Sequence, residues 1–208
     1  MMVFPLEGVY LMSVISLFES QSSLLNAAEL MPLIEICKSD SRVHGLKLRE
    51  AHYKLGKMLA KRILEDLSSQ YITVVIMMRA GLCFGLGIAD ELELFGIKLS
   101  VLFYHNEEQW KKEKVNWNQM FDNDIILTDA VINTGNNIIQ LANSIQNNKE
   151  ILFASNVLAF KSVHKFSDKR LYTTRISENS FTGSKILVVK DGKGPDTGDR
   201  LFTQYEFT

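Results

Sequence analysis

The sequence IILTDAVINTGNN at residues 125–137 runs from a hydrophobic stretch through an acid and a short turn to Thr-Gly and a polar stretch. This order predicts a strand that ends at Asp129 and a helix that begins near Gly135. The unpaired amides and the dipole at a helix N-terminus favour a phosphate group, and Asp129 is suited to accept hydrogen bonds from sugar hydroxyls. In the alternative interpretation, Thr134 only caps the helix and Asp129 only caps the turn.

Apolar, β-branched segments recur on both sides of this stretch and predict four more strands, at residues 71–78, 99–104, 151–158 and 186–189. Helical patterns separate several of them, at residues 83–94 and 136–145, and an amphipathic helix is expected at residues 46–67. Strands that alternate with helices need right-handed crossovers, which make the strands parallel. The expected fold class is α/β, with a mostly parallel central sheet flanked by helices.

The composition predicts a single soluble domain without a highly charged partner. A chain of 208 residues, 46% of them hydrophobic, is long enough to bury a real core. Its 23 basic and 24 acidic residues give a formal net charge of −1. We therefore expect no nucleic-acid partner and no membrane surface, because the chain has no overall field to hold them.

The N-terminal region carries an apolar stretch at residues 8–18, but no Lys or Arg precedes it. We interpret it as core rather than as a signal peptide, and no apolar run reaches the roughly 18 residues that a membrane span needs. Residues 10–37 are expected to be helical and contain no motif that indicates chemistry. Cys37 and Cys83 are too few for a disulfide scaffold, which favours a reduced, cytoplasmic protein.

Two further loops follow expected strands. Arg79, Ala80 and Gly81 come directly after the strand at residues 71–78, where small residues allow a ligand close to the backbone and Arg offers a planar fork for phosphate. In the alternative interpretation this Arg only extends from a strand end into water. Residues 192–200, GKGPDTGDR, form a defined loop of three glycines, a proline, two acids and an Arg, or an ordinary C-terminal turn.

Taken in order, these segments resemble the uracil phosphoribosyltransferases, a family with the phosphoribosyltransferase fold. In that family an Arg-Ala-Gly closes the first core strand, as residues 79–81 do here. The family's loop Asp-Pro-Met-Leu-Ala-Thr-Gly-Gly-Ser is similar to residues 129–137, and its Gly-Asp-Ala-Gly-Asp-Arg-Ile-Phe is similar to residues 195–202. Its Tyr-Arg-Asp-Glu-Glu is similar to residues 104–108, so the likeness runs from about residue 46 to residue 202.

The resemblance implies one phosphoribosyltransferase-like domain over residues 1–208, with an N-terminal helical arm at 1–45 and a flap at 104–121. It implies a glycosyltransferase of pyrimidine salvage that transfers phosphoribosyl from 5-phosphoribosyl 1-pyrophosphate to a nucleobase, uracil first, giving UMP and pyrophosphate. Mg²⁺ is expected to bind mainly through the pyrophosphate. The implied partners are these small molecules and further copies of the chain, in a homodimer or higher homo-oligomer.

The resemblance also implies a site, carried over position by position. Arg79 would contact pyrophosphate and Asp129 would hold the ribose hydroxyls, so these two residues are the expected catalytic pair. The expected base-binding residues are Pro195, Asp196 and Thr197, and no residue is expected to bind a metal directly. The expected residues for binding phosphoribosyl pyrophosphate are Arg79, Ala80, Gly81, His105, Asp129, Ala130, Val131, Ile132, Asn133, Thr134, Gly135, Asn136 and Asn137.

Five residues in three segments depart from the family pattern. His105 and Asn106 replace the flap Arg-Asp, so a fixed charge becomes an imidazole. Asn136 and Asn137 replace Gly-Ser, and Pro195, which lacks an N–H group, replaces Gly. These departures motivate an alternative hypothesis, a catalytically impaired relative that serves as a nucleotide-binding or regulatory module.

Overall fold

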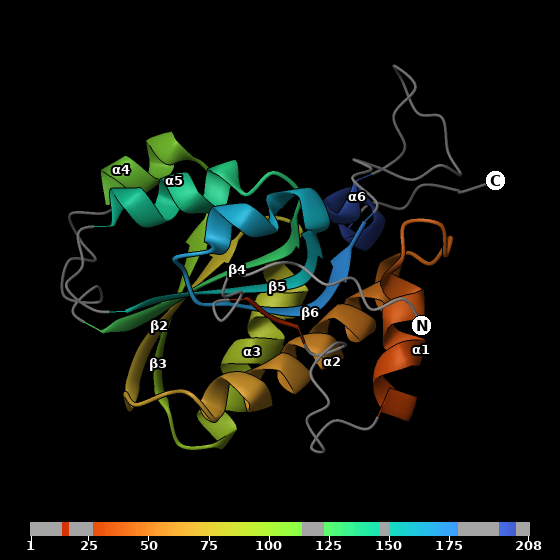
Figure 1. Ribbon diagram of the computed structural model, residues 1–208, viewed down its shortest axis with the longest axis horizontal. Helices are drawn as coiled ribbons and strands as arrows, with labels where there is room; N and C mark the ends of the chain where they lie inside the picture. Colours follow the sequence, from red (N-terminus) through yellow and green to blue (C-terminus); the bar gives the residue numbers. More distant parts are fainter. Residues whose placement is uncertain (1–13, 17–26, 114–122, 146–149, 179–195, 203–208) are drawn as a thin grey trace, which may run out of the picture.

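The computed structural model describes residues 14–16, 27–113, 123–145, 150–178 and 196–202. Within these residues six strands form one sheet in the order β1-β6-β5-β4-β2-β3, and every neighbouring pair is parallel. Figure 1 shows the sheet running through the centre of the molecule. The strands are β1 (Val14–Ser16), β2 (Tyr71–Met77), β3 (Lys98–Tyr104), β4 (Asp124–Ile132), β5 (Ile151–Ala159) and β6 (Leu171–Ser177).

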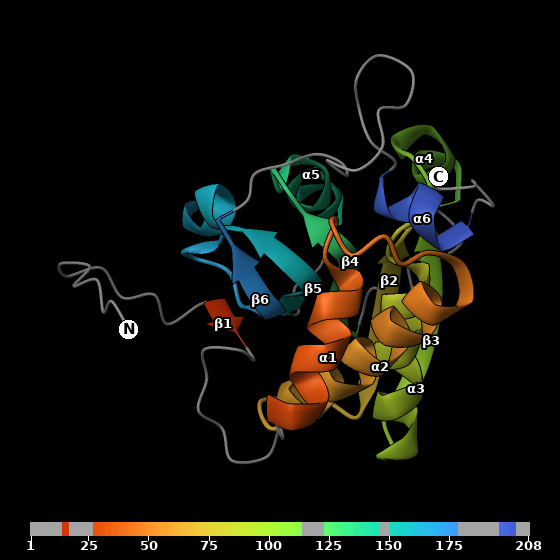
Figure 2. The same ribbon diagram turned by 90° about the vertical axis from the view of Figure 1, so that its right-hand side faces the viewer.

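Helices cover both faces of the sheet (Figures 1 and 2). One apolar core joins the sheet to α1 (Ala27–Cys37), α2 (Gly45–Leu64) and α3 (Leu82–Leu94). The second core, on the other face, includes α4 (Glu107–Glu113), α5 (Asn136–Ser144) and the 3₁₀ helix η2 (Phe160–Phe166). The short helix α6 (Thr197–Phe202) packs against α2 and buries Leu201 in the first core.

Burial on both faces explains why the central strands are apolar. In β2, Ile72 and Ile76 pack into the first core, whereas Val75 and Met77 pack into the second. In β4, Ile126 faces the first core and Leu127 the second. Alternation between two apolar cores is what a parallel sheet covered by helices requires. The predicted α/β fold class is confirmed.

Helices α2 and α3 approach each other at two glycines. A β-carbon on Gly56 would lie 2.1 Å from the carbonyl oxygen of Phe84, and one on Gly87 would lie 2.1 Å from that of Tyr53. Any side chain at either position would overlap the backbone of the other helix, so the two backbones are in direct contact. This contact fixes the position of α3, which begins directly after the loop that follows β2.

The structure corrects three expectations about the elements. Within the region expected to be helical, residues 10–37, Val14–Ser16 form a strand that pairs with β6. Strand β6 itself was not predicted, because the middle of LYTTRIS is the polar run at residues 173–175. Strand β4 does not end at Asp129 but continues to Ile132. The strand expected at residues 186–189 lies outside the described residues.

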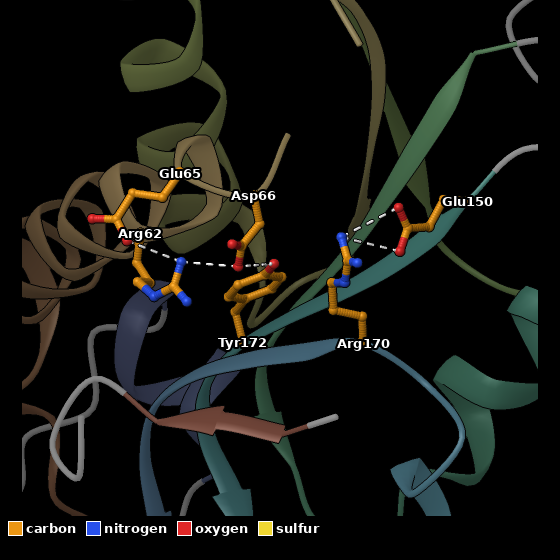
Figure 3. A network of polar contacts seen from close by, with 6 residues as sticks. All are labelled: Arg62, Glu65, Asp66, Glu150, Arg170 and Tyr172. Atoms are coloured by element: carbon orange, nitrogen blue, oxygen red, sulfur yellow. Dashed lines mark hydrogen bonds and ion pairs between the residues drawn. The ribbon is translucent and has the colours of Figure 1, made fainter. Parts of the chain in front are cut away.

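A polar network anchors the amino end of β6 (Figure 3). The Tyr172 hydroxyl donates to Asp66 Oδ2 at 2.8 Å, and Arg62 donates to the same oxygen at 2.9 Å. Arg170 pairs with Glu150 at 3.2 Å, which ties the start of β6 to the start of β5. These contacts lie at the edge opposite to the one where the parallel strands end.

Among the described residues, no helix has both the length and the apolar character to cross a membrane.

Candidate active site

A cavity of about 680 Å³ opens at the carboxyl ends of the strands. Its walls come from the ends of β2, β4, β5 and β6, from residues 37–40 after α1, and from α6. In a parallel sheet, this edge is where ligands bind. Its volume lies in the range of small-molecule sites.

Most of the predicted site residues meet in this cavity. Those that line it are Arg79, Ala80, Asp129, Val131, Ile132, Asn133, Asn137, Asp196 and Thr197. The predicted residues that do not line it are Gly81, His105, Ala130, Thr134, Gly135 and Asn136. Pro195 lies outside the described residues.

Arg79 is held beside α6 by an ion pair. Its Nη2 atom donates to Asp199 Oδ1 at 2.6 Å, and both side chains remain partly exposed, at 52% and 30%. Asp196 accepts a hydrogen bond from the Asp199 amide at 2.7 Å, so one of its carboxylate oxygens caps α6. The Arg79 guanidinium therefore lies at the mouth of the cavity with its charge already partly balanced.

Gly81 lets the Arg79 loop lie against β4. A β-carbon at this position would lie 2.5 Å from the Met77 carbonyl oxygen and 3.4 Å from the Asp129 Cα atom. Only a residue without a side chain fits between these two backbones. Gly81 therefore contributes to the site by allowing Arg79 and Asp129 to come from adjacent strands into one cavity.

Asp129 is half-buried in the cavity wall. Burial raises the pKa of its carboxyl from 3.8 to about 7, against the effect of backbone N–H groups of Val131 and Ala130 that donate to it. The Val131 amide lies 3.4 Å from Asp129 Oδ1. The carboxyl consequently changes charge near neutral pH, which suits a group that accepts hydrogen bonds from a ligand.

The turn after β4 is held by side chains of η2. Ser162 donates to the Asn133 carbonyl at 2.5 Å, and Lys165 donates to the Thr134 carbonyl at 2.8 Å and to Asn136 Oδ1 at 2.7 Å. The Thr134 hydroxyl accepts a weak hydrogen bond of 3.4 Å from the Asn136 amide, and the N-cap residue of α5 is Gly135. Gly135 has the positive φ of 73° and precedes α5.

The beginning of the predicted flap forms α4 and packs on the sheet. Trp110 is buried and meets Tyr104 edge to face, with ring centroids 5.6 Å apart. Lys111 and Lys112 pair with Glu107 and Glu108 one turn earlier, at 2.5 and 2.7 Å. His105 is exposed and precedes this helix. The remainder of the flap, residues 114–121, lies outside the described residues.

Sequence reasoning missed the contribution of α1 and β6 to the cavity. Cys37 and Asp40 line it from the end of α1, and Arg175 lines it from β6. The N-terminal region carried no recognisable motif, so nothing marked these residues. The available signal was an arginine within the Thr-rich segment at residues 171–177.

Metal binding by the protein alone is not apparent in the described part of the chain. Those residues contain no group of three or more His, Cys, Asp or Glu side chains placed to hold a metal ion. Asp40, Asp129 and Asp196 do line the cavity as separate carboxylates. Such a set fits Mg²⁺ that arrives with a phosphate ligand and takes one or two protein oxygens.

Comparison with known proteins gives one family match. Residues 54–203 match the family model described as uracil phosphoribosyltransferase. The matched range contains β2 to β6 and α6, and so every element of the cavity wall except the end of α1. No curated protein sequence matches the chain significantly.

Two solved structures are similar at low identity. A hypothetical protein from Neisseria gonorrhoeae with bound ppGpp is 11% identical, with a TM-score of 0.44 over 62% of this chain and 80% of the other. Hypoxanthine-guanine phosphoribosyltransferase from Schistosoma mansoni, in complex with IMP, is 16% identical, with a TM-score of 0.40 over 60% of this chain and 63% of the other.

Proposed function

The chain belongs to the uracil phosphoribosyltransferase family, and we propose that it transfers the phosphoribosyl group of 5-phosphoribosyl 1-pyrophosphate to a nucleobase. Uracil is the first acceptor to test, with UMP and pyrophosphate as products. The observation that carries this proposal is the meeting of Arg79, Asp129, Asn133 and Asn137 in one cavity. The proposal places the enzyme in pyrimidine salvage.

The proposed roles follow the chemistry of each side chain. Arg79 is a donor for pyrophosphate, because its guanidinium presents a planar fork to phosphate oxygens. Asp129 accepts hydrogen bonds from the ribose hydroxyls, and its raised pKa makes this contact depend on pH near neutrality. The turn at Asn133 and the start of α5 at Asn137 hold the 5′-phosphate beside a helix N-terminus.

In the proposed reaction a ring nitrogen of the base attacks the anomeric carbon, the bond from that carbon to pyrophosphate breaks, and the proton of the ring N–H passes to the departing pyrophosphate or to water. Positive charge develops on the ribose and negative charge on the leaving group. Asp129 lies on the ribose side and Arg79 on the pyrophosphate side, so each opposes the charge expected near it. Bound Mg²⁺ would neutralise pyrophosphate, with Asp129 and Asp196 as the nearby carboxylates. Catalysis is then mainly positioning and electrostatics.

A second candidate function is binding of a phosphoribosyl compound or nucleotide without turnover. Two observations favour it. His105 stands where the family has a flap arginine, and Arg79, the expected pyrophosphate donor, is already paired with Asp199 at 2.6 Å. A ligand phosphate must compete with this carboxylate for the guanidinium.

The test is release of pyrophosphate from 5-phosphoribosyl 1-pyrophosphate, Mg²⁺ and uracil, followed by a panel of other free bases. Asp129→Asn is expected to reduce turnover at least about tenfold, because it removes a charged acceptor. Asp124→Asn is the matched control at the opposite end of β4. Absence of turnover with every base contradicts the proposed enzymatic activity. Stabilisation of the protein against heat by 5-phosphoribosyl 1-pyrophosphate then supports the second candidate function, binding without turnover.

Gel filtration tests the proposed homo-oligomer.

A further inference from the structure

Arg175 lines the cavity from β6, and its side chain has no hydrogen-bond acceptor among the residues that the structure describes. Its Nε atom is buried and has no partner, and no carboxylate in the described part of the chain lies within 4 Å of the guanidinium. The side chain as a whole is partly buried, so water compensates only part of the desolvation of its charge and no counter-charge offsets the rest. The position therefore favours an anion that comes from outside the chain.

The acidic groups around Arg175 do not supply the anion that its guanidinium lacks. Burial lowers the pKa of Arg175, while Cys37, Glu35 and Asp40 act in the opposite direction. Glu35 already pairs with Lys38 at 2.5 Å. Burial raises the pKa of the Cys37 thiol to about 11, so this group is neutral at physiological pH. Asp40 is the remaining acid, and it attracts Arg175 from beyond ion-pair distance.

Arg200 is a useful contrast, because it lines the same cavity and is satisfied by the protein. Its Nε and Nη2 atoms donate to the Val43 carbonyl at 3.2 and 2.8 Å, and Nη2 also donates to Ser41 Oγ at 3.0 Å. This arginine ties α6 to the chain between α1 and α2. Arg175 has no comparable partner in the described ranges of the chain, which favours a ligand-binding role over a structural one.

Strand register places Arg175 away from the ribose residue. Arg175 pairs with Val157 on β5, which pairs with Val131 on β4, two residues beyond Asp129. Two strand spacings amount to about 10 Å. The backbone of Arg175 therefore lies on the β6 side of the cavity, two strands away from the strand that carries Asp129, and both residues line the cavity wall.

We propose that Arg175 binds an acidic group on the acceptor base, so that the favoured acceptor is a pyrimidine that carries a carboxylate. This inference rests on the proposed function and narrows its acceptor from uracil to an acidic derivative. A guanidinium and a carboxylate form two parallel hydrogen bonds, which orient a planar ring as well as bind it. The same donors also suit a phosphate oxygen of 5-phosphoribosyl 1-pyrophosphate, which the experiment must separate.

The experiment compares uracil with uracil-5-carboxylate and uracil-6-carboxylate in the pyrophosphate-release assay. The wild-type chain is expected to favour one carboxylated base at least about tenfold in kcat/KM. Arg175→Gln is expected to raise the KM for that base about 10- to 100-fold, the range for one charged hydrogen bond. Arg175→Lys keeps the charge and is expected to restore part of the preference. Arg170→Gln, at the other end of β6, is the matched control, and circular dichroism verifies folding of each variant.

Each outcome decides the inference. Turnover of uracil at least as fast as that of both carboxylated bases overturns it and leaves the proposed function intact. A rise in the KM for 5-phosphoribosyl 1-pyrophosphate alone in Arg175→Gln also overturns it, because the anion is then the donor's phosphate. If no base is turned over, the proposed function fails. Calorimetric titration then measures whether the carboxylated bases bind, and this result decides whether the inference about Arg175 holds. Binding that Arg175→Gln weakens at least tenfold supports the site, and absence of binding overturns it.

Discussion

The Nη2 atom of Arg79 lies 2.6 Å from Oδ1 of Asp199, so an ion pair joins the loop after β2 to α6, 120 residues further along the chain. The pair links two parts of the sequence that both carry family-like motifs. It also sets the charge that a phosphate group meets when it approaches Arg79.

We expect Asp199→Asn to strengthen binding of pyrophosphate, because the substitution removes a carboxylate that competes for the Arg79 guanidinium. The pair is partly exposed, so stability should change by less than about 1 kcal/mol. Calorimetric titration with pyrophosphate and Mg²⁺ measures the affinity. Asp168→Asn, which removes an equally negative side chain paired with Lys169, is the control. Unchanged or weaker binding in Asp199→Asn contradicts competition.

Asp129 should make the stability of the fold depend on pH. Its folded pKa of about 7 lies above the ordinary 3.8, so the native state holds a proton that the unfolded chain has released. Wild-type stability should therefore fall between about pH 4 and pH 7, by on the order of 1 kcal/mol per unit at most. Asp129→Asn lacks this slope. Urea unfolding at pH 5 and pH 8 measures the free energy of unfolding of both proteins. The free energy of Asp129→Asn minus that of the wild type should increase from pH 5 to pH 8. The same value at both pH values is incompatible with the raised pKa.

Gly81→Ala should damage the site through the backbone. The added β-carbon would meet the Met77 carbonyl oxygen at 2.5 Å, so the loop that carries Arg79 must shift. We expect a loss of about 1–3 kcal/mol of stability and weaker binding of pyrophosphate. In Gly45→Ala, where φ is 62° and no atom lies within 4 Å, only conformational strain is added. Urea melts and pyrophosphate titrations of both variants provide the comparison, and equal pyrophosphate affinities would show that the Gly81 contact does not position Arg79.

Tyr172→Phe should destabilise the fold without affecting the cavity. The Tyr172 hydroxyl donates to a carboxylate oxygen of Asp66 that also accepts from Arg62, and the tyrosine ring is fully buried. Loss of the hydroxyl and its hydrogen bond should lower the free energy of unfolding by on the order of 1–3 kcal/mol. Tyr71→Phe, at a half-exposed ring, is the control and should change stability by less than about 0.5 kcal/mol. Thermal or urea unfolding measures both, and a neutral Tyr172→Phe disproves a stabilising role of the network in Figure 3.

The apolar strands were predictable because burial on both faces leaves a mostly apolar run, which is rich in β-branched residues in Tyr71–Met77 and includes the apolar start ILFA in Ile151–Ala159. Strand β6 was not predictable from an apolar pattern. Thr173 and Thr174 make hydrogen bonds to side chains of β5, and Arg175 lines the cavity, so these three residues are polar. The strand at Val14–Ser16 was missed for a different reason. Three residues are too few to show a period, and their pairing with β6 is a long-range contact.

The candidate site was predictable where its residues lie near the carboxyl end of an apolar strand, as Arg79 does two residues after β2 and Asp129 does three residues before the end of β4. The ionisation of Asp129 was not predictable, because it depends on how the surrounding elements exclude water. The partners of the 133–136 turn, Ser162 and Lys165, lie about 30 residues downstream in an element without a motif. Arg175 and Cys37 reach the cavity only through tertiary packing, which local patterns do not encode.

The backbone contact between α2 and α3 at Gly56 and Gly87 has a consequence for how the molecule can respond to substrate. Two helices without intervening side chains have no room to slide or rotate past each other, so this half of the molecule behaves as a rigid base. Conformational change during a catalytic cycle is then expected in α4 and α6, whose packing rests on side chains. Amide hydrogen exchange should accordingly be slow along α2 and α3 and should respond to ligand in α4 and α6.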